Sequence, residues 1–269
     1  MRNKKVLMMV ECAVMIALAT TLSVIKLIDM PYGGSVTLGA MLPIAIIAYR
    51  HGLGYGMSCA LVASVLQLLL GLENFSYVTG WQSIIALALF DYIFAYIAFG
   101  LGGIFKNAFK NRGVSLLAGV TLGNIIRYVC HVISGATVWA GLPIPDAAAL
   151  GYSVSYNATY MIPETIITAA LALYIGSAID FGKTIPTRVK SEGRDGASEL
   201  SMLLAGLVLA ACVVVDSVLI FKHLQLPSGE FGFVGLSAVN WTAVCIVSAV
   251  CALLITALVI YSRYKRKNS

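Results

Sequence analysis

Charged side chains are scarce in this chain of 269 residues: 11% of its residues are Asp, Glu, Lys or Arg, and 59% are hydrophobic. With a mean hydropathy of +0.90, the chain has too few polar groups to cover the surface of a soluble globule of this length. Its composition is that of an integral membrane protein.

Motifs for metal or phosphate chemistry are also missing. None of the six cysteines belongs to a CxxC pair, and all lie in apolar stretches, so we expect packing thiols and no bound metal. The segment from Gly176 to Lys183 comes near a phosphate-binding loop, but five residues separate its glycines where four are required. We therefore expect no ATP hydrolysis by this chain itself and no cofactor.

Apolar runs recur along the whole chain. Their approximate ranges are 6–27, 38–49, 53–72, 84–105, 114–140, 158–179, 200–221 and 238–261. Because about 20 residues span the hydrocarbon layer, these runs predict an all-α integral membrane protein of eight helices. The second run is short, so it either needs help from flanking residues or packs inside the bundle.

Basic residues are distributed by membrane side, which explains the formal charge of +6 better than nucleic-acid binding does. They lie at both chain ends and in the loops after every second run: Arg2, Lys4, Lys5, Arg50, Lys106, Lys110, Arg112, Lys183, Arg188, Lys190, Arg194, Arg263, Lys265, Arg266 and Lys267. The positive-inside rule assigns that side to the cytoplasm. We expect a multi-pass protein of the plasma membrane with both termini in the cytoplasm.

A charged cytoplasmic linker, residues 183–199, divides the chain into two parts. Residues 1–182 hold six predicted helices, and residues 200–269 hold two more helices and a basic tail. The unusual polar residues inside apolar runs precede the linker, except Asp216, which we assign to a helix end or a packing contact. The first part is therefore the expected substrate-binding domain, and the second an accessory extension.

Polar and aromatic side chains gather in or beside the fifth and sixth runs, where such groups are costly in lipid and mark ligand sites. They are Arg127, His131, Trp139, Tyr152, Asn157 and Glu164, and Asp91 lies in the fourth run. Carboxylates suit a cation, aromatic rings suit a flat heterocycle, and an amide suits its hydrogen-bonding edge. The set predicts a site for a small organic cation.

Arg127, His131, Gly135 and Trp139 follow each other at intervals of four, which places them along one flank of a helix. Trp139 is expected near the outer surface, His131 about 12 Å deeper, and Gly135 leaves space for a flat ligand. Each has a structural alternative, since His packs in many cores, Trp is common at membrane interfaces and Gly serves helix contacts. Asp91 either pairs with Arg127 or balances the charge of a ligand.

Four stretches of sequence carry a family resemblance: PYGGSVTLGAMLP at residues 31–43, DY at 91–92, RYVCHVISG at 127–135 and YSVSYNATYMIP at 152–163. They resemble the thiamine-specific S components of energy-coupling factor transporters. The resemblance covers residues 1 to about 182 and implies a six-helix S-component bundle that captures thiamine outside the cell, followed here by two additional transmembrane helices. It also implies docking on a transmembrane coupling protein with two cytoplasmic ATPases, which alone would use ATP.

The same resemblance implies roles for individual residues. Asp91 would face the thiazolium ring with Tyr92 beside it, and the pocket wall would hold His131, Gly135, Trp139, Tyr152 and Asn157. The first loop, with Tyr32, Gly33 and Gly34, would act as a lid. Ala13 and Ala17, four residues apart on the first helix, resemble the face that S components present to the coupling protein.

Two other functions fit parts of the pattern. A self-sufficient, ion-coupled carrier for a small organic cation would need no ATPase partner. An intramembrane enzyme would use His131 with Asp91 or Glu164 as acid and base, but the chain has no nucleophile–base motif, metal pattern or paired-carboxylate signature. We therefore expect a transporter subunit rather than an enzyme.

Overall fold

Two compact units make up the structure, a computed structural model that describes residues 4–30, 33–139, 141, 147–189, 196–224 and 233–268. The units are Met1–Gly176 and Ser177–Ser269. Seven helices among the described residues are long and apolar enough to cross a membrane. The fold is therefore the predicted helical, multi-pass membrane architecture, with two short hairpins added.

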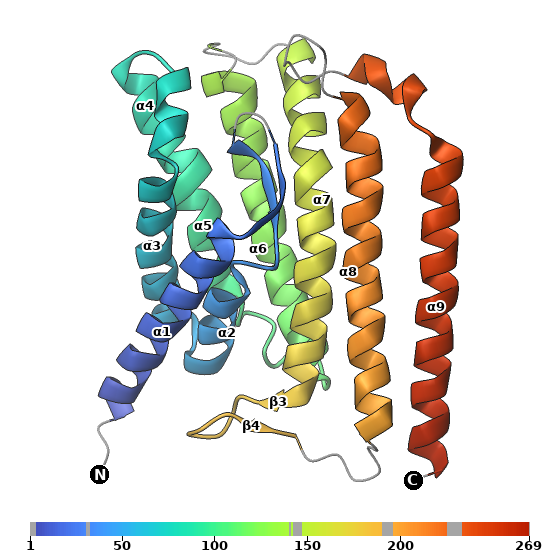
Figure 1. Cartoon of the computed structure of the whole chain (residues 1–269). Helices are drawn as coiled ribbons and strands as arrows, with labels where there is room; N and C mark the ends of the chain where they lie inside the picture. The colour runs from blue at the N-terminus through green and yellow to red at the C-terminus, as the bar shows by residue number, and fades with distance from the viewer. Residues whose placement is uncertain are drawn as a thin grey trace. The chain divides into compact units, whose positions relative to one another are not determined.

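The first unit is a bundle of helices with irregular segments between them (Figure 1). Its elements are α1 (Lys4–Val24), β1 (Lys26–Asp29), β2 (Ser35–Thr37), α2 (Leu42–His51), α3 (Leu53–Leu70), η2 (Leu72–Tyr77), α4 (Trp81–Leu87), η3 (Ala88–Phe94), α5 (Ala95–Ile97), η4 (Ala98–Leu101), α6 (Arg112–Ser134), η5 (Gly135–Trp139) and α7 (Ala147–Ala178). The segments Trp81–Leu101 and Arg112–Trp139 are each long enough to span a membrane.

The second helix packs inside the bundle, which decides between the two possibilities left by its short apolar run. α2 has ten residues, and every side chain from Leu42 to Tyr49 is buried. Helix α3 packs closely against α2, as Gly56 of α3 shows: a Cβ added there would overlap Ala48. The prediction of eight spanning helices is thus reduced to seven among the described residues.

The connection between α1 and α2 is folded into the bundle. Its strands β1 and β2 pair antiparallel, and Val36 is fully buried. The hydroxyl of Thr37, at the end of β2, donates a hydrogen bond of 3.0 Å to Glu164 of α7. Strand β2 therefore belongs to the core of this unit and reaches its buried polar residues, whereas β1 is half-buried or exposed.

Two stretches of π-helix interrupt the regular helices of the first unit. The segment η3 follows α4 without a break, and η5 continues α6 at its C-terminal end. A π-turn has i to i+5 hydrogen bonds and shifts the following side chains around the helix axis, and such turns are frequent at functional sites. Asp91 and Tyr92 lie in η3, and Gly135 and Trp139 lie in η5.

The second unit consists of a short hairpin and two long helices. Its elements are β3 (Ile179–Asp180), β4 (Thr187–Arg188), α8 (Gly196–Leu224), η6 (Phe233–Ala238) and α9 (Trp241–Asn268). The helices α8 and α9 lie side by side (Figure 1), and Ser248 of α9 donates a hydrogen bond of 2.7 Å to Asp216 of α8. Asp216 therefore serves a packing contact, as predicted.

Candidate functional site

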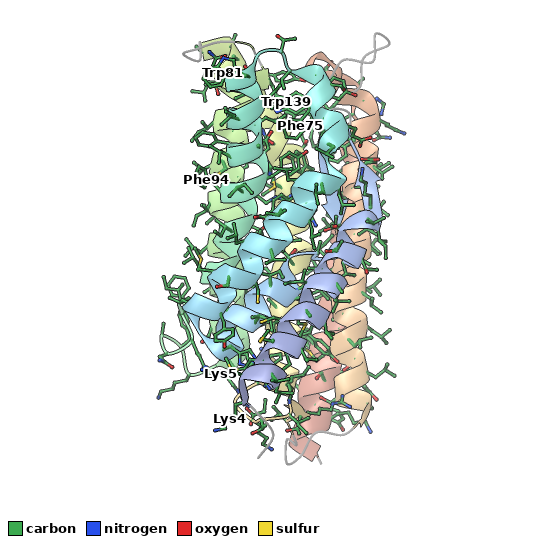
Figure 2. All side chains as sticks on the ribbon, turned by 90° about the vertical axis from the view of Figure 1, so that its left-hand side faces the viewer. Lys4, Lys5, Phe75, Trp81, Phe94 and Trp139 are labelled. Atoms are coloured by element: carbon green, nitrogen blue, oxygen red, sulfur yellow. The ribbon has the colours of Figure 1, made fainter. Side chains whose placement is uncertain are left out.

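The predicted site lies toward one end of the first unit. Figure 2 shows Trp139 and Phe75 near the end that carries Trp81, opposite the end that carries Lys4 and Lys5. If the lysines mark the cytoplasmic side, these aromatic residues lie toward the outer side, as expected for Trp139.

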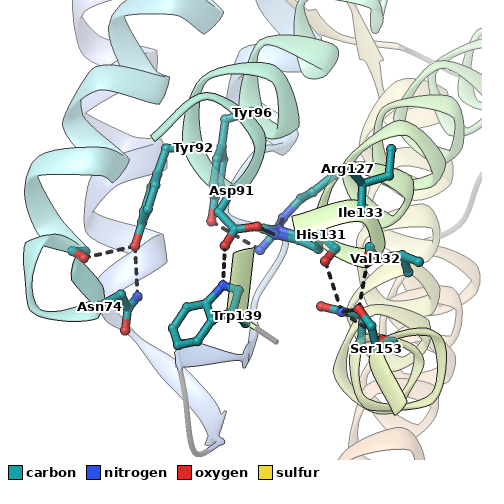
Figure 3. Close-up of polar contacts among 12 residues, drawn as sticks. Asn74, Asp91, Tyr92, Tyr96, Arg127, His131, Val132, Ile133, Trp139 and Ser153 are labelled. Atoms are coloured by element: carbon teal, nitrogen blue, oxygen red, sulfur yellow. Dashed lines mark hydrogen bonds and ion pairs between the residues drawn. The ribbon is translucent and has the colours of Figure 1, made fainter. Parts of the chain in front are cut away.

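Asp91 is the residue on which the site converges. Its Oδ1 atom lies 3.0 Å from Nδ1 of His131, and its Oδ2 atom accepts a hydrogen bond of 2.8 Å from Nε1 of Trp139 (Figure 3). The Asp91 side chain retains only 12% exposure. The predicted grouping of Asp91, His131 and Trp139 is therefore present, although these residues come from two different helices.

The hydrogen bonds assign the tautomer of His131. The Nε–H of Arg127 donates to Nε2 of His131 over 3.1 Å, and an arginine nitrogen in this position can only donate. Nε2 must therefore be the unprotonated acceptor, and Nδ1 carries the proton that it donates to Asp91. His131 is a neutral ring that orients the carboxylate without neutralising it.

Arg127 does not pair directly with Asp91, so one of the two arrangements left open for that acid is wrong. Its Nη1 instead donates to Glu164 over 3.3 Å, with both side chains buried. Its Nη2 donates to the hydroxyl of Tyr96 over 3.2 Å, and its guanidinium carbon lies 4.7 Å from the centre of the Tyr96 ring. These contacts place Arg127 and Glu164 behind His131.

The connected side chains carry an uneven charge. With both carboxylates ionised, Asp91 and Glu164 contribute −1 each, Arg127 contributes +1, and the His131 tautomer assigned above is neutral. The net charge of −1 resides on Asp91, because Glu164 already has an ionic partner. A buried charge without a counterion is unfavourable in a membrane, so the arrangement favours a cationic ligand.

Aromatic rings pair beside this carboxylate, toward the end of the unit that carries Trp81. The ring of Trp139 lies 5.8 Å from that of Tyr77 in η2, and the ring of Tyr92 stacks on Phe75 at 5.9 Å. The Tyr92 hydroxyl donates to the carbonyl of Gly71 and accepts from the side chain of Asn74. Although Tyr92 follows Asp91 in the sequence, its side chain is held by contacts with η2 and the adjacent Gly71.

A row of tyrosines on α7 leads to His131. The rings of Tyr152 and Tyr156 stack at 6.1 Å, Tyr156 and Tyr160 meet edge to face at 5.8 Å, and Tyr160 meets His131 at 6.5 Å. Tyr152 is the exposed end of this row, at 39% exposure, whereas Tyr160 is buried. The structure therefore connects the predicted residue Tyr152 to His131 through two further rings.

Asn157 and Gly135 join α7 to the end of α6. The amide nitrogen of Asn157 donates to the carbonyl of His131 on α6 over 3.4 Å and to the carbonyl of Ser153 on its own helix, and its oxygen accepts from Tyr160 over 2.5 Å. A Cβ on Gly135 would overlap the hydroxyl of Ser153. The prediction that Gly135 leaves space for a flat ligand is therefore corrected: Ser153 occupies that space, and the glycine permits a close helix contact.

The predicted lid and docking residues are only partly described. Tyr32 lies outside the described residues. Gly34 lies against the tyrosine row, since a Cβ there would come within 2.8 Å of Tyr160. Ala13 and Ala17 are both exposed on α1, on a face that also exposes the apolar side chain of Val14.

Several residues at the site were not predicted from the sequence. They are Thr37, Asn74, Tyr77, Tyr96, Ser153 and Tyr160. Tyr160 continues the spacing of four that relates Tyr152 to Tyr156, so that pattern could have indicated it. Tyr96 follows Asp91 by five residues, which places the two apart on an α-helix, and only the π-segment between them explains their shared direction.

Comparison with known proteins assigns the family. The model of the thiamine transporter protein family (Thia_YuaJ) matches residues 9–180, more than half of the chain. The chain belongs to this family. All nine residues predicted for the site from Asp91 to Glu164 fall inside the matched range, whereas α8 and α9 lie beyond it.

Individual members of the thiamine transporter family show the same extent of similarity. The thiamine transporter ThiT of Bacillus subtilis is 34% identical over 179 residues, which are 62% of this chain and 89% of that protein. ThiT of Lacticaseibacillus paracasei is 25% identical over 183 residues, 62% of this chain and 85% of that protein. The solved structure of ThiT from Listeria monocytogenes matches with a TM-score of 0.51 at 22% identity, over 64% of this chain and 94% of that chain, which shows a shared fold.

Proposed function

We propose that this chain binds thiamine with high affinity at the outer side of the plasma membrane and serves as the substrate-specific S component of an energy-coupling factor transporter. Membership of the thiamine transporter family supports this proposal. The observation that carries it is the Asp91 carboxylate, which His131 and Trp139 orient and which Arg127, paired with Glu164 instead, does not neutralise.

The chemistry of thiamine fits this group of side chains. Its thiazolium ring has a fixed positive charge that Asp91 balances, and its aminopyrimidine is a flat ring with hydrogen-bonding edges. Trp139 offers a ring for stacking beside the same carboxylate. Asn157 can hydrogen-bond the aminopyrimidine by exchanging its contacts with Ser153 or Tyr160.

Energy for transport comes from other subunits under this proposal. The chain acts as a carrier of substrate rather than as an enzyme, and ATP is used by two cytoplasmic ATPases bound to a transmembrane coupling protein. The exposed small residues Ala13 and Ala17 of α1 form the docking face for that protein, since small side chains let helices approach closely in a membrane. Both termini lie in the cytoplasm.

Equilibrium titration of the purified protein with thiamine tests the binding step. Asp91→Asn removes the charge opposite the thiazolium and is expected to cost about 2 to 5 kcal/mol, or at least about 30-fold in Kd. Asp216→Asn is the matched control, because it removes the other intramembrane aspartate, in the second unit, and should leave the Kd unchanged. Equal affinity in the Asp91 variant and the parent would remove Asp91 from the site.

Uptake into lipid vesicles tests the source of energy. Vesicles that contain this chain alone should bind thiamine without accumulating it, and accumulation should require the coupling protein, both ATPases and internal ATP. Accumulation by the chain alone, driven by an ion gradient, would instead identify a self-sufficient carrier.

A further inference from the structure

A continuous line of hydrogen bonds connects the β1–β2 hairpin to Asp91. The hydroxyl of Thr37 and Nη1 of Arg127 both donate to Oε1 of Glu164, over 3.0 and 3.3 Å. Nε of Arg127 donates to His131 over 3.1 Å, and His131 lies 3.0 Å from Asp91. Each link has a partner in the next, so the ligand-facing carboxylate and the first loop share one network.

We propose that Arg127 is a positioning residue that fixes the tautomer of His131 and makes this tautomer depend on the seating of the β1–β2 hairpin. Its consequence is that the hairpin and the bound thiamine stabilise each other, and this consequence rests on the proposed function. It concerns residues that do not touch the ligand, since Arg127 and Glu164 lie behind His131.

The guanidinium of Arg127 is linked to Asp91 through His131. It is 6% exposed, and its three kinds of nitrogen donate to Glu164, Tyr96 and His131. Without the Nε donor, the proton of His131 is free to reside on Nε2. Nδ1 would then present a lone pair to the Asp91 carboxylate, and two acceptors at 3.0 Å repel each other.

The hairpin affects this arrangement through Glu164. Because Thr37 and Arg127 share Oε1, the hydroxyl of Thr37 helps to hold the carboxylate in the rotamer that orients Arg127. A second contact acts in the same direction, since Gly34 lies against Tyr160, and the Tyr160 ring meets His131. A hairpin that leaves its seat therefore releases His131 from two sides.

Nitrogen NMR of the ligand-free protein tests the tautomer. The chain has three histidines, and the signals of His131 are identified by their loss in His131→Gln. The variant to compare is Arg127→Met with Glu164→Met, because replacing both members of a buried ion pair is far less disruptive than leaving one charge unpaired. We expect protonated Nδ1 in the parent and a substantial Nε2-protonated population in the double variant. An unchanged tautomer in the double variant would overturn the proposal.

Thiamine dissociation rates test the dependence on the hairpin. Thr37→Val is expected to raise the rate about 2- to 10-fold, whereas Thr165→Val, one residue from Glu164 with its hydroxyl bonded to Met161, should not. In the Arg127→Met, Glu164→Met background, the carboxylate that Thr37 bonds is already absent, so Thr37→Val should raise the dissociation rate less than it does in the parent. The bond from Ala40 N–H to the Thr37 hydroxyl is lost in both backgrounds and cancels in this comparison.

The two measurements separate the possible failures. Equal effects of Thr37→Val in the two backgrounds would overturn the coupling to the hairpin. If the double variant does not fold, Thr37→Val and Thr165→Val alone decide, and equal dissociation rates overturn the proposal. If the parent does not bind thiamine, the proposed function fails, while the ligand-free NMR measurement still decides the role of Arg127.

Discussion

Two ring N–H groups hold the Asp91 carboxylate, and only one of them belongs to a residue suited to stack on a ligand. His131 is oriented by Arg127 and turned toward Tyr160, whereas Trp139 lies beside Tyr77 near the end of the bundle that carries Trp81. Trp139 therefore has two separable roles, one as a hydrogen-bond donor and one as a flat apolar surface.

Substitution of Trp139 by Phe and by Ala separates these roles. Trp139→Phe keeps a ring but loses the donor to Asp91, and Trp139→Ala loses both. Stacking of a base on an aromatic side chain contributes about 1 to 3 kcal/mol, so we expect the Ala variant to bind thiamine more weakly than the Phe variant by about that amount in titrations.

Trp81→Phe is the control for Trp139, since Trp81 is 68% exposed and should not change the Kd. Equal losses in the Phe and Ala variants would assign the whole effect to the hydrogen bond with Asp91 and would contradict stacking.

At the scale of elements, periodicity predicted the helices but not their irregular turns. The residues from Arg127 to Trp139 were expected at regular intervals of four, yet η5 replaces the last turn, and Ser153 lies where a ligand was expected against Gly135. Side-chain types carry no clear signal for a π-turn, because its cost is offset by tertiary contacts that only the folded bundle reveals. For the same reason, the spacing of residues around Asp91 did not predict that Tyr96 belongs to the site.

The contact at Gly135 gives a prediction about stability. A Cβ there would overlap the Ser153 hydroxyl, and overpacking of this kind costs about 1 to 3 kcal/mol. Gly135→Ala should therefore lower the Tm of the detergent-purified protein, and adding Ser153→Ala should restore part of it.

Gly151→Ala is the matched control for Gly135→Ala. Gly151 is also helical, but a Cβ there meets nothing within 4 Å, so the substitution should leave the Tm unchanged or raise it. A Gly135→Ala protein as stable as its parent would show that α6 and α7 can move apart without cost.

At the scale of the whole molecule, composition and charge predicted a multi-pass membrane protein, and the motifs predicted the residues that meet around Asp91. The sequence could not predict which of these residues lie around Asp91 and which support them from behind. Asp91, His131 and Trp139 form one cluster, while Arg127 and Glu164 form a buried ion pair behind it. Residue type and spacing are the same for a ligand contact and for its support, and only the hydrogen-bond partners distinguish them.

The second unit should be dispensable for thiamine binding. The described residues of the site all belong to the first unit, and the family match ends at residue 180. The similarity to ThiT of Bacillus subtilis covers 89% of that relative, which leaves no room there for a second pair of membrane helices. Removal of residues 190–269, which keeps strands β3 and β4, should therefore leave the thiamine Kd within about 2-fold, a difference of about 0.4 kcal/mol.

Titration of the shortened chain checks this prediction, with Asp91→Asn in the same shortened chain as the control that should abolish tight binding. Helical circular dichroism confirms that the shortened protein is folded before the comparison is made. A folded, shortened chain that no longer binds thiamine would assign part of the site to the second unit. Retained binding with lost uptake in vesicles that contain the ATPases would instead assign α8 and α9 to assembly of the transporter.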